Sequence, residues 1–171
     1  MAEKFEIERK YLVRMPQSDI PGIKTHKHII QTYITDGEGG SQRRVRKIEE
    51  NDSVTYTYTE KVFLTRITRR ENEYEITEEE YEEFLKHPKT GLVPVEKTRY
   101  CFEYKNQLFE LDVYPFSDRL AILEIELENA QQEIFFPEYI DIVGEVSENA
   151  EYSNARLAAA GKFPDTIGDK E

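Results

Sequence analysis

Residues 6–10 read Glu6-Ile7-Glu8-Arg9-Lys10, an alternating Glu-x-Glu-x-Lys pattern near the start of the chain. Because side chains of a β-strand alternate between its two faces, Glu6, Glu8 and Lys10 are expected to share one face. Two carboxylates suit Mg²⁺ or Mn²⁺, and an ammonium group suits a phosphate oxygen. The pattern also fits an ordinary solvated strand face with an internal ion pair, so this stretch alone leaves both interpretations open.

The same two-residue spacing of polar and charged side chains recurs in strand after strand. The pairs are Arg44 and Arg46, Thr59 and Lys61, Glu73 and Glu75, Lys97 and Arg99, Glu110 and Asp112, and Glu124 and Glu126. An open sheet would turn this charged face to water, but it would also leave two strand edges unpaired. Closure into a barrel removes the edges and places the charged faces around a lumen. Such a lumen is costly unless metal, polyanion and water occupy it, which favours a functional interpretation.

Strand signals dominate the chain, and helices are few. Strands are expected over residues 4–13, 27–35, 42–49, 53–62, 71–76, 95–104, 107–114 and 120–128. A capping box of Thr77 and Glu80 predicts a helix to about Lys86, and further helices are expected near 131–140 and from Ser153 to Ala160. The predicted fold class is α+β, mainly β. It is a closed eight-stranded antiparallel β-barrel with a few flanking helices, in a single domain of residues 1–171.

The amino-acid composition limits which binding partners and which cellular location are expected. A net charge of −12 disfavours a nucleic-acid partner, because proteins that bind DNA or RNA usually carry a basic stripe. No apolar run approaches the roughly 20 residues that span a bilayer, and no signal-peptide pattern precedes the first strand. With a single Cys101 and three scattered His, a thiolate–imidazole zinc site is excluded, and a cytoplasmic protein is expected. An acidic surface with exposed aromatic side chains is compatible with a homodimer.

This ordered set of strand motifs resembles the CYTH superfamily, the triphosphate tunnel metalloenzymes, over nearly the whole chain. The matching motifs are Glu6-x-Glu8-x-Lys10, Gln31-x-Tyr33, Arg44-x-Arg46, Thr59-x-Lys61, Glu73-x-Glu75, Lys97-x-Arg99, Asp112, Glu124-x-Glu126 and Tyr152-Ser153-Asn154. Thr32 stands where the family usually has Gly, and the chain has no Trp. The resemblance implies an eight-stranded antiparallel barrel that encloses a tunnel and acts on a triphosphate with a divalent metal.

Within that resemblance, each group of tunnel residues has an expected role. The expected substrate-binding bases are Lys10, Arg44, Arg46, Lys61, Lys97 and Arg99. The expected ligands of Mg²⁺ or Mn²⁺ are Glu6, Glu8, Glu124 and Glu126, with Glu73, Glu75 and Asp112 as candidates for a second metal or for positioning water. Lys10 and Tyr33 are the expected catalytic pair, each lowering the pKa of the other if the two lie close together and partly desolvated, with packing as the alternative for Tyr33. Arg69 and Arg70 are either substrate contacts or loop-end cations.

The expected function is metal-dependent hydrolysis of a small-molecule triphosphate. Inorganic tripolyphosphate, cleaved to pyrophosphate and phosphate, is the predicted substrate, with weaker activity on nucleoside triphosphates. The absence of Trp and of the His-Phe signature of larger adenylyl cyclase members favours this over an adenylyl cyclase or a thiamine triphosphatase. A polyphosphate- or nucleotide-binding module is the non-enzymatic alternative. The complete set of acids disfavours it, because binding alone needs only the bases.

Overall fold

Antiparallel strands make up most of the computed structural model, which describes residues 2–165 and the side chains of residues 5–165. The strands are β1 (Ala2–Arg14), β2 (Ile23–Ile34), β3 (Gln42–Glu50), β4 (Ser53–Phe63), β5 (Thr68–Ile76), β6 (Val95–Tyr104), β7 (Gln107–Val113), β8 (Leu120–Leu127) and β9 (Ile142–Glu145). The helices are α1 (Glu78–Phe84), α2 (Asn154–Ala160) and the 3-10 turns η1 (Glu38–Gly40) and η2 (Ala150–Tyr152). Within this part of the chain, no helix has the length and apolar character needed to cross a membrane.

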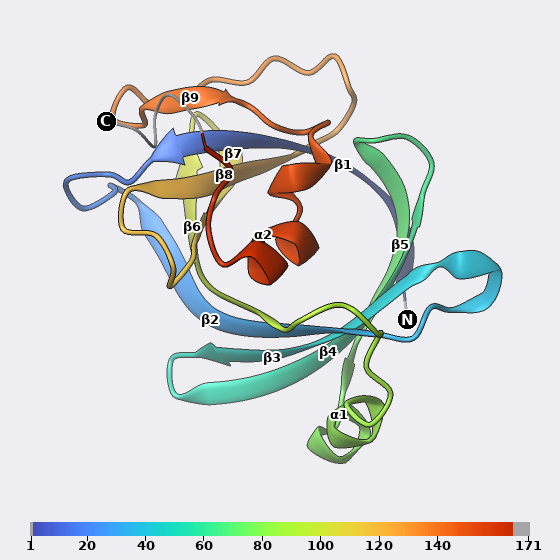
Figure 1. The fold of residues 1–171 in the computed structure, drawn as a ribbon. Coiled ribbons are helices and arrows are strands. Elements are labelled where there is room, and N and C mark those ends of the chain that lie inside the picture. Colours follow the sequence, from blue (N-terminus) through green and yellow to red (C-terminus); the bar gives the residue numbers. More distant parts are fainter. Residues whose placement is uncertain (1, 166–171) are drawn as a thin grey trace.

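Eight of these strands close into a barrel. They are hydrogen-bonded in the order β5-β4-β3-β2-β6-β7-β8-β1, and β1 pairs back onto β5 (Figure 1). The long strand β1 makes closure geometrically simple, since residues 2–7 pair with β5 and residues 7–14 pair with β8. The short strand β9 adds to the outside of β1 at Tyr11–Val13. The predicted closed eight-stranded antiparallel barrel is therefore confirmed.

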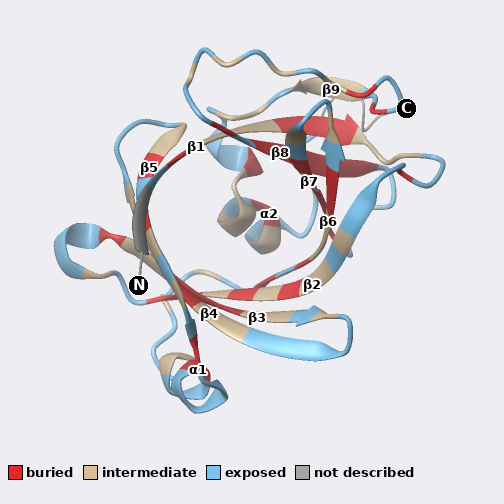
Figure 2. Cartoon of the chain, turned by 180° about the vertical axis from the view of Figure 1, so that it is seen from behind, coloured by how far each residue is buried: buried red, intermediate tan, exposed pale blue. Residues whose placement is uncertain are grey.

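Apolar side chains pack on the outside of the barrel in two separate clusters. The larger contains Tyr11, Phe109 and Ile125, and the loop after β8 covers it with Ile134 and Phe136. The second lies beneath α1, which packs against β3 and β4 outside the barrel (Figure 1). The far end of the β3–β4 hairpin and most of α1 remain exposed (Figure 2).

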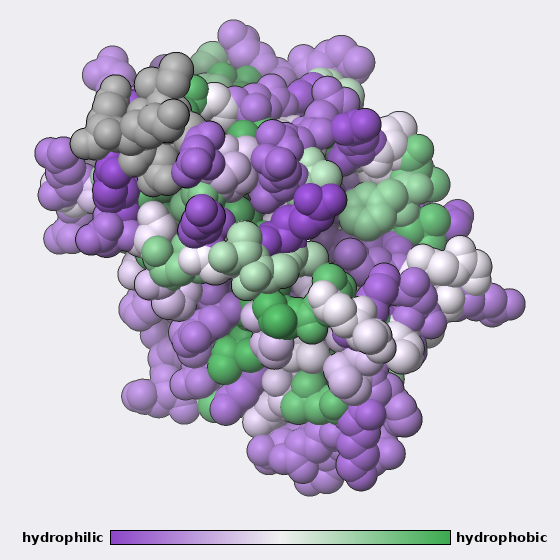
Figure 3. Space-filling view, viewed as in Figure 1, coloured by the Kyte–Doolittle hydropathy of each residue, from purple (hydrophilic) through white to green (hydrophobic). Residues whose placement is uncertain are grey.

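A third apolar cluster lies inside the barrel, at one of its ends. Leu12 follows Lys10 and Ile122 precedes Glu124 on the same strand faces, so the inner wall changes from charged to apolar along its length. Leu157 of α2 packs into this apolar end together with Tyr152. As a result, α2 lies across the middle of the ring of strands (Figure 1), with Ser153 capping its first turn. On this side of the molecule, hydrophobic patches lie among a larger hydrophilic surface (Figure 3).

Two local elements differ from the sequence-based expectations. The helix expected near 131–140 is wrong, because this stretch is an irregular loop. The side chain of Asn129 bonds the backbone N–H of Gln131, Pro137 lacks a donor, and Ile134 and Phe136 reach the core at the two-residue spacing of extended chain. The other difference is β9, whose four residues carry too little alternation to predict a strand.

Candidate active site

A cavity of about 570 Å³ occupies the charged part of the barrel interior. All eight barrel strands contribute side chains to its wall, and residues from the segment 146–154, which ends at the first residue of α2, close one side. The residues predicted from the sequence that border it are Glu6, Glu8, Lys10, Tyr33, Arg44, Arg46, Lys61, Glu73, Arg99, Glu124 and Glu126. The structure thus brings together side chains from positions 6 to 126 of the chain.

Three of the predicted residues do not border the cavity. Lys97 and Asp112 are fully buried in the wall and bond each other, with 2.8 Å between Lys97 Nζ and Asp112 Oδ2. Burial, together with the charge of Arg99, lowers the pKa of Lys97 to about 8. Glu75 is exposed at the far end of β5. Arg70, on the opposite face of β5 from Arg69, is exposed and lies outside the cavity wall.

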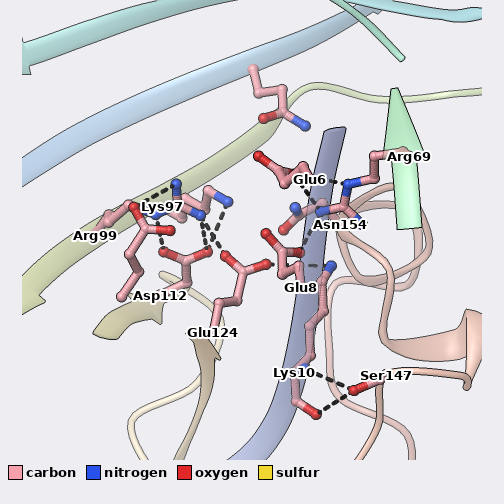
Figure 4. Close-up of polar contacts among 12 residues, drawn as sticks. Glu6, Glu8, Lys10, Arg69, Lys97, Arg99, Asp112, Glu124, Ser147 and Asn154 are labelled. Carbon is pink, nitrogen blue, oxygen red and sulfur yellow. Dashed lines mark hydrogen bonds and ion pairs between the residues drawn. The ribbon is translucent and has the colours of Figure 1, made fainter. Parts of the chain in front are cut away.

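Arg69 clamps the two acids of the opening motif (Figure 4). Its Nε lies 2.8 Å from Glu6 Oε1, and its Nη2 lies 2.7 Å from Glu8 Oε1. Burial alone would raise the pKa of Glu8, but the charges of Arg69, Lys10 and Lys61 outweigh it and lower the pKa to about 2. Both carboxylates are therefore ionised at neutral pH and present hard oxygen donors to the cavity.

A second ionic cluster lies across the cavity (Figure 4). Arg99 donates from Nε to Asp112 Oδ1 at 2.8 Å and from Nη2 to Glu124 Oε2 at 2.6 Å. Lys10 Nζ lies 3.5 Å from Glu124 Oε1. Burial would lower the pKa of Lys10, but Glu124 and Glu8 raise it, so Lys10 stays charged. The expected lowering of the Lys10 pKa is therefore wrong, because two acids face this lysine.

Arg44 and Arg46 stand apart from these clusters because the structure gives them no acid partner. Both are buried, and no carboxylate among residues 5–165 lies within ion-pairing distance of either. Arg46 Nε donates to Gln31 Oε1 at 2.7 Å, whereas the buried Nε of Arg44 has no hydrogen-bond partner in this part of the chain. Burial and the neighbouring charges of Arg44 and Arg99 lower the pKa of Arg46 to about 10. Two buried guanidinium groups side by side favour an anion between them.

Lys61 is the third base on this side of the cavity. Its Nζ lies 3.4 Å from Glu71 Oε2 and 3.7 Å from Glu6 Oε1. Burial and the charges of Arg44 and Arg69 nevertheless lower the pKa of Lys61 to about 7. Near neutral pH this ammonium group is therefore poised between its charged and neutral forms.

Tyr33 is held at the cavity wall by Gln31, and no hydrogen bond among the described residues joins it to Lys10. Gln31 Nε2 donates to the Tyr33 hydroxyl at 2.9 Å, and the ring packs in the apolar cluster around α2. The hydroxyl oxygen therefore accepts a hydrogen bond from Gln31, and the hydroxyl proton takes no part in this bond. Packing and a polar role in the cavity are thus both open to this residue.

Several cavity residues were missed from the sequence. They are Gln42, Phe63, Arg66, Glu71 and Asn154. Glu71 carries a usable signal, because it continues the alternation from Arg69 to Glu73 on the inner face of β5. Asn154 was recognised as part of the Tyr152-Ser153-Asn154 motif but given no role, because it reaches the cavity only through the tertiary placement of α2 inside the barrel (Figure 4).

Comparison with known proteins identifies similar chains. The model of the CYTH domain matches residues 4–155. The inorganic triphosphatase NE1496 is 31% identical, with a TM-score of 0.54, over 90% of this chain and 94% of that one. A second structure, of the hypothetical protein NE1496, has the same identity and TM-score over 93% and 99% of the two chains. PH1819 from Pyrococcus horikoshii OT3 is 17% identical, with a TM-score of 0.52 over 71% and 80%, and shares the fold. A comparison with curated proteins found no match.

Proposed function

This chain belongs to the CYTH domain family, and we propose that it is a divalent-metal-dependent hydrolase that cleaves inorganic tripolyphosphate to pyrophosphate and phosphate. The observation that carries this proposal is the pair of buried guanidinium groups, Arg44 and Arg46, that face the cavity without an acid partner among the described residues. The likeness to the inorganic triphosphatase NE1496 supports the same substrate class.

The bases of the cavity can hold a chain of phosphates from several sides. Arg44 and Arg46 offer planar forks of donors, and Lys61 and Lys10 add compact charges from β4 and β1. Arg99 also borders the cavity, but it is shared among Asp112, Glu110 and Glu124. We therefore assign Arg44, Arg46, Lys61 and Lys10 to direct substrate binding. Arg99 and the buried Lys97 set the charge and position of the acids around them.

The acids of the cavity fit a divalent metal that binds together with substrate. Among residues 5–165, no three acidic, His or Cys side chains gather closely enough to hold an ion by themselves. Mg²⁺ needs only one or two carboxylates, with phosphate oxygens and water completing its shell. Glu6 and Glu8 provide that pair. Glu124 and Glu126 are the next candidates, and Glu73 is the remaining acid of the expected second set that borders the cavity. We propose Mg²⁺ or Mn²⁺ as the metal.

Hydrolysis requires positioning and neutralisation of charge more than covalent help. A bound divalent ion supplies charge neutralisation on phosphate oxygens and an acidified water. We propose that a water oxygen bonds to a terminal phosphorus while the bond to the bridging oxygen breaks, and pyrophosphate leaves with that bond's electron pair. One proton of the water stays on the phosphate that forms, and the other passes to the leaving pyrophosphate or to solvent. Arg44 and Arg46 hold the phosphates in line, and charged Lys10 stabilises the negative charge that develops. We propose that the Tyr33 hydroxyl, which accepts from Gln31 Nε2, donates to a phosphate oxygen.

Metal dependence is the first prediction. Release of phosphate from tripolyphosphate should stop in EDTA and return with Mg²⁺ or Mn²⁺. Glu8→Gln should raise the metal concentration needed for half-maximal rate, because the amide keeps the shape of the side chain but removes its charge. Glu128→Gln, an exposed acid just beyond β8 and outside the cavity wall, is the matched control. Full turnover in chelator would reject the metal assignment.

Further proposals concern the type of substrate, the cellular location, the domain organisation and the oligomeric state of the protein. We propose a small-molecule substrate rather than nucleic acid, because the bases are enclosed in the barrel while the net charge is −12. We also propose a cytoplasmic protein whose residues 1–171 form one domain. Sedimentation at several protein concentrations would test whether it is a monomer or the homodimer that its acidic surface and exposed aromatic side chains permit.

A further inference from the structure

One aromatic ring at the cavity wall belongs to none of the apolar clusters formed by residues 5–165. Phe63, the last residue of β4, borders the cavity and is 52% exposed. Tyr33 and Tyr152 also border it, but both are buried in the apolar cluster around α2. Single exposed apolar side chains are common on protein surfaces, so exposure by itself says little. The position of Phe63 relative to the bases is the informative feature.

Phe63 lies directly beyond the bases on the inner face of the barrel. It shares that face with Lys61, and two residues of strand separate them by roughly 7 Å. The register sets Phe63 opposite Arg69 on β5, and Arg69 Cζ lies 5.8 Å from the centre of the ring. Arg66, in the hairpin that follows, also borders the cavity and donates to the carbonyl of Glu148. The ring therefore lies where a phosphate chain held on Lys61 and Arg44 would continue toward solvent.

We propose that Phe63 is a stacking platform for the organic group of a nucleoside triphosphate. This inference rests on the proposed function for the position of the phosphates, and it adds a second class of ligand to the same cavity. A base can stack on an aromatic ring whatever its hydrogen-bonding pattern, because every base has a π-face. Phe has no polar atom with which to read a base edge. The platform should therefore accept all four nucleotides and favour the larger purines.

A different role for Phe63 makes a different prediction. Its contact with Arg69 could serve only to hold that arginine against Glu6 and Glu8. Loss of the ring would then disturb the acids and affect every triphosphate equally. A stacking platform affects only ligands that carry an organic ring, and tripolyphosphate, which has none, separates the two roles.

The test compares Phe63→Ala and Phe63→Trp with the wild-type chain. Calorimetry with the non-hydrolysable analogue adenylyl imidodiphosphate and Mg²⁺ gives a Kd that does not depend on turnover, and phosphate release gives KM for tripolyphosphate. Leu64→Ala is the matched control, because Leu64 is the next residue, is 49% exposed and lies outside the cavity wall. We expect Phe63→Ala to weaken binding of the analogue roughly five- to tenfold, at the low end of the range for base–aromatic stacking. Phe63→Trp and Leu64→Ala should bind it as the wild type does.

Each result decides one of the two proposals. An unchanged Kd for the analogue in Phe63→Ala, or no binding of the analogue by the wild type, would overturn the platform. Equal losses for the analogue and tripolyphosphate would also overturn it, in favour of the role through Arg69. If the wild type binds the analogue through Phe63 but does not hydrolyse tripolyphosphate, the platform stands and the proposed function fails.

Discussion

At the scale of single residues, Arg44 and Arg46 of β3, which have no acid partner among residues 5–165, allow the most direct test of the site. Replacing Arg44 or Arg46 by Ala should remove a charge-assisted contact worth about 1.5–3 kcal/mol, which lowers kcat/KM for tripolyphosphate roughly 10- to 100-fold. The variants should stay folded, because neither guanidinium pairs with a described acid, and Arg46→Ala should be the less stable of the two because it also removes the donor to the buried Gln31 Oε1. Lys47→Ala is the control, since it removes the same charge from the opposite face of β3. Near wild-type kinetics in both arginine variants would reject the cavity as the substrate site.

Lys61 should make substrate binding depend on pH. Its pKa is lowered to about 7 by burial and by Arg44 and Arg69, so the ammonium form that attracts phosphate is lost as the pH rises through 7. Bound phosphate favours that ammonium form, so binding above pH 7 should take up a proton. We expect KM for tripolyphosphate to rise from pH 6.5 to pH 8.5. We also expect calorimetry in buffers of different ionisation enthalpy to detect the proton.

Lys61→Arg provides the comparison for this pH dependence. An arginine stays charged throughout this range, so the variant should lose the part of the proton uptake that belongs to residue 61. Titration of the ligand itself is common to both proteins and cancels in the difference. Equal proton uptake by the wild type and the variant at pH 8 would show that Lys61 does not titrate on binding.

The face of the strand on which each side chain lies could be predicted from the sequence, but its position along the barrel axis could not. Alternation assigned Glu6, Lys10, Arg44 and Lys61 to the inner wall, and all of them border the cavity. The same alternation grouped them with Lys97, which the structure buries against Asp112 instead. Height along the barrel depends on the tilt and stagger of the strands, which one strand's sequence does not encode. Phe63 was missed for another reason, since an apolar side chain at a strand end carries no signal of a charged cavity.

At the scale of elements, the long strands were predictable and the short ones were not. The eight barrel strands appear where polar and apolar positions alternate, and α1 begins at the capping box of Thr77 and Glu80. The strand β9 is held by its pairing with β1 and has no periodicity of its own. Closure was predictable because eight alternating strands with few helices leave no other way to cover two edges. The entry of α2 into the barrel depends on packing against side chains that are distant in the sequence, so it could not be predicted from the local sequence of α2.

The helix α2 should contribute to stability through Leu157. This side chain is fully buried in the apolar end of the barrel, next to Leu12 and Ile122. Leu157→Ala should lower the free energy of unfolding by about 2–5 kcal/mol, because it removes buried methyl groups and leaves a cavity. Arg156→Ala, on the exposed side of the same helix, should change it little. Urea denaturation of the two variants measures both values, and equal midpoints would place α2 outside the barrel.

At the scale of the whole molecule, closure concentrates charge of both signs in one enclosed space. The acids of β1 and β8 face one cavity with bases from β3 and β4, although the chain as a whole carries a net charge of −12. An acidic exterior repels polyanions in general, so binding depends on what fits between the enclosed bases. Selectivity should therefore follow the length and charge of the phosphate chain before any organic group.

Substrate choice follows from this arrangement. Tripolyphosphate can contact Arg44, Arg46 and Lys61 at once, and it lacks the ester that lowers the charge of ATP. It should therefore have the highest kcat/KM, with ATP second and pyrophosphate poor because two phosphates cannot span the bases. Phosphate release measured across the three compounds at equal free Mg²⁺ tests the order, and chromatography of the products separates pyrophosphate from cyclic AMP. If ATP were converted mainly to cyclic AMP, or thiamine triphosphate were preferred to tripolyphosphate, the substrate proposed here would be wrong, while the phosphate-binding role of the arginines could still hold.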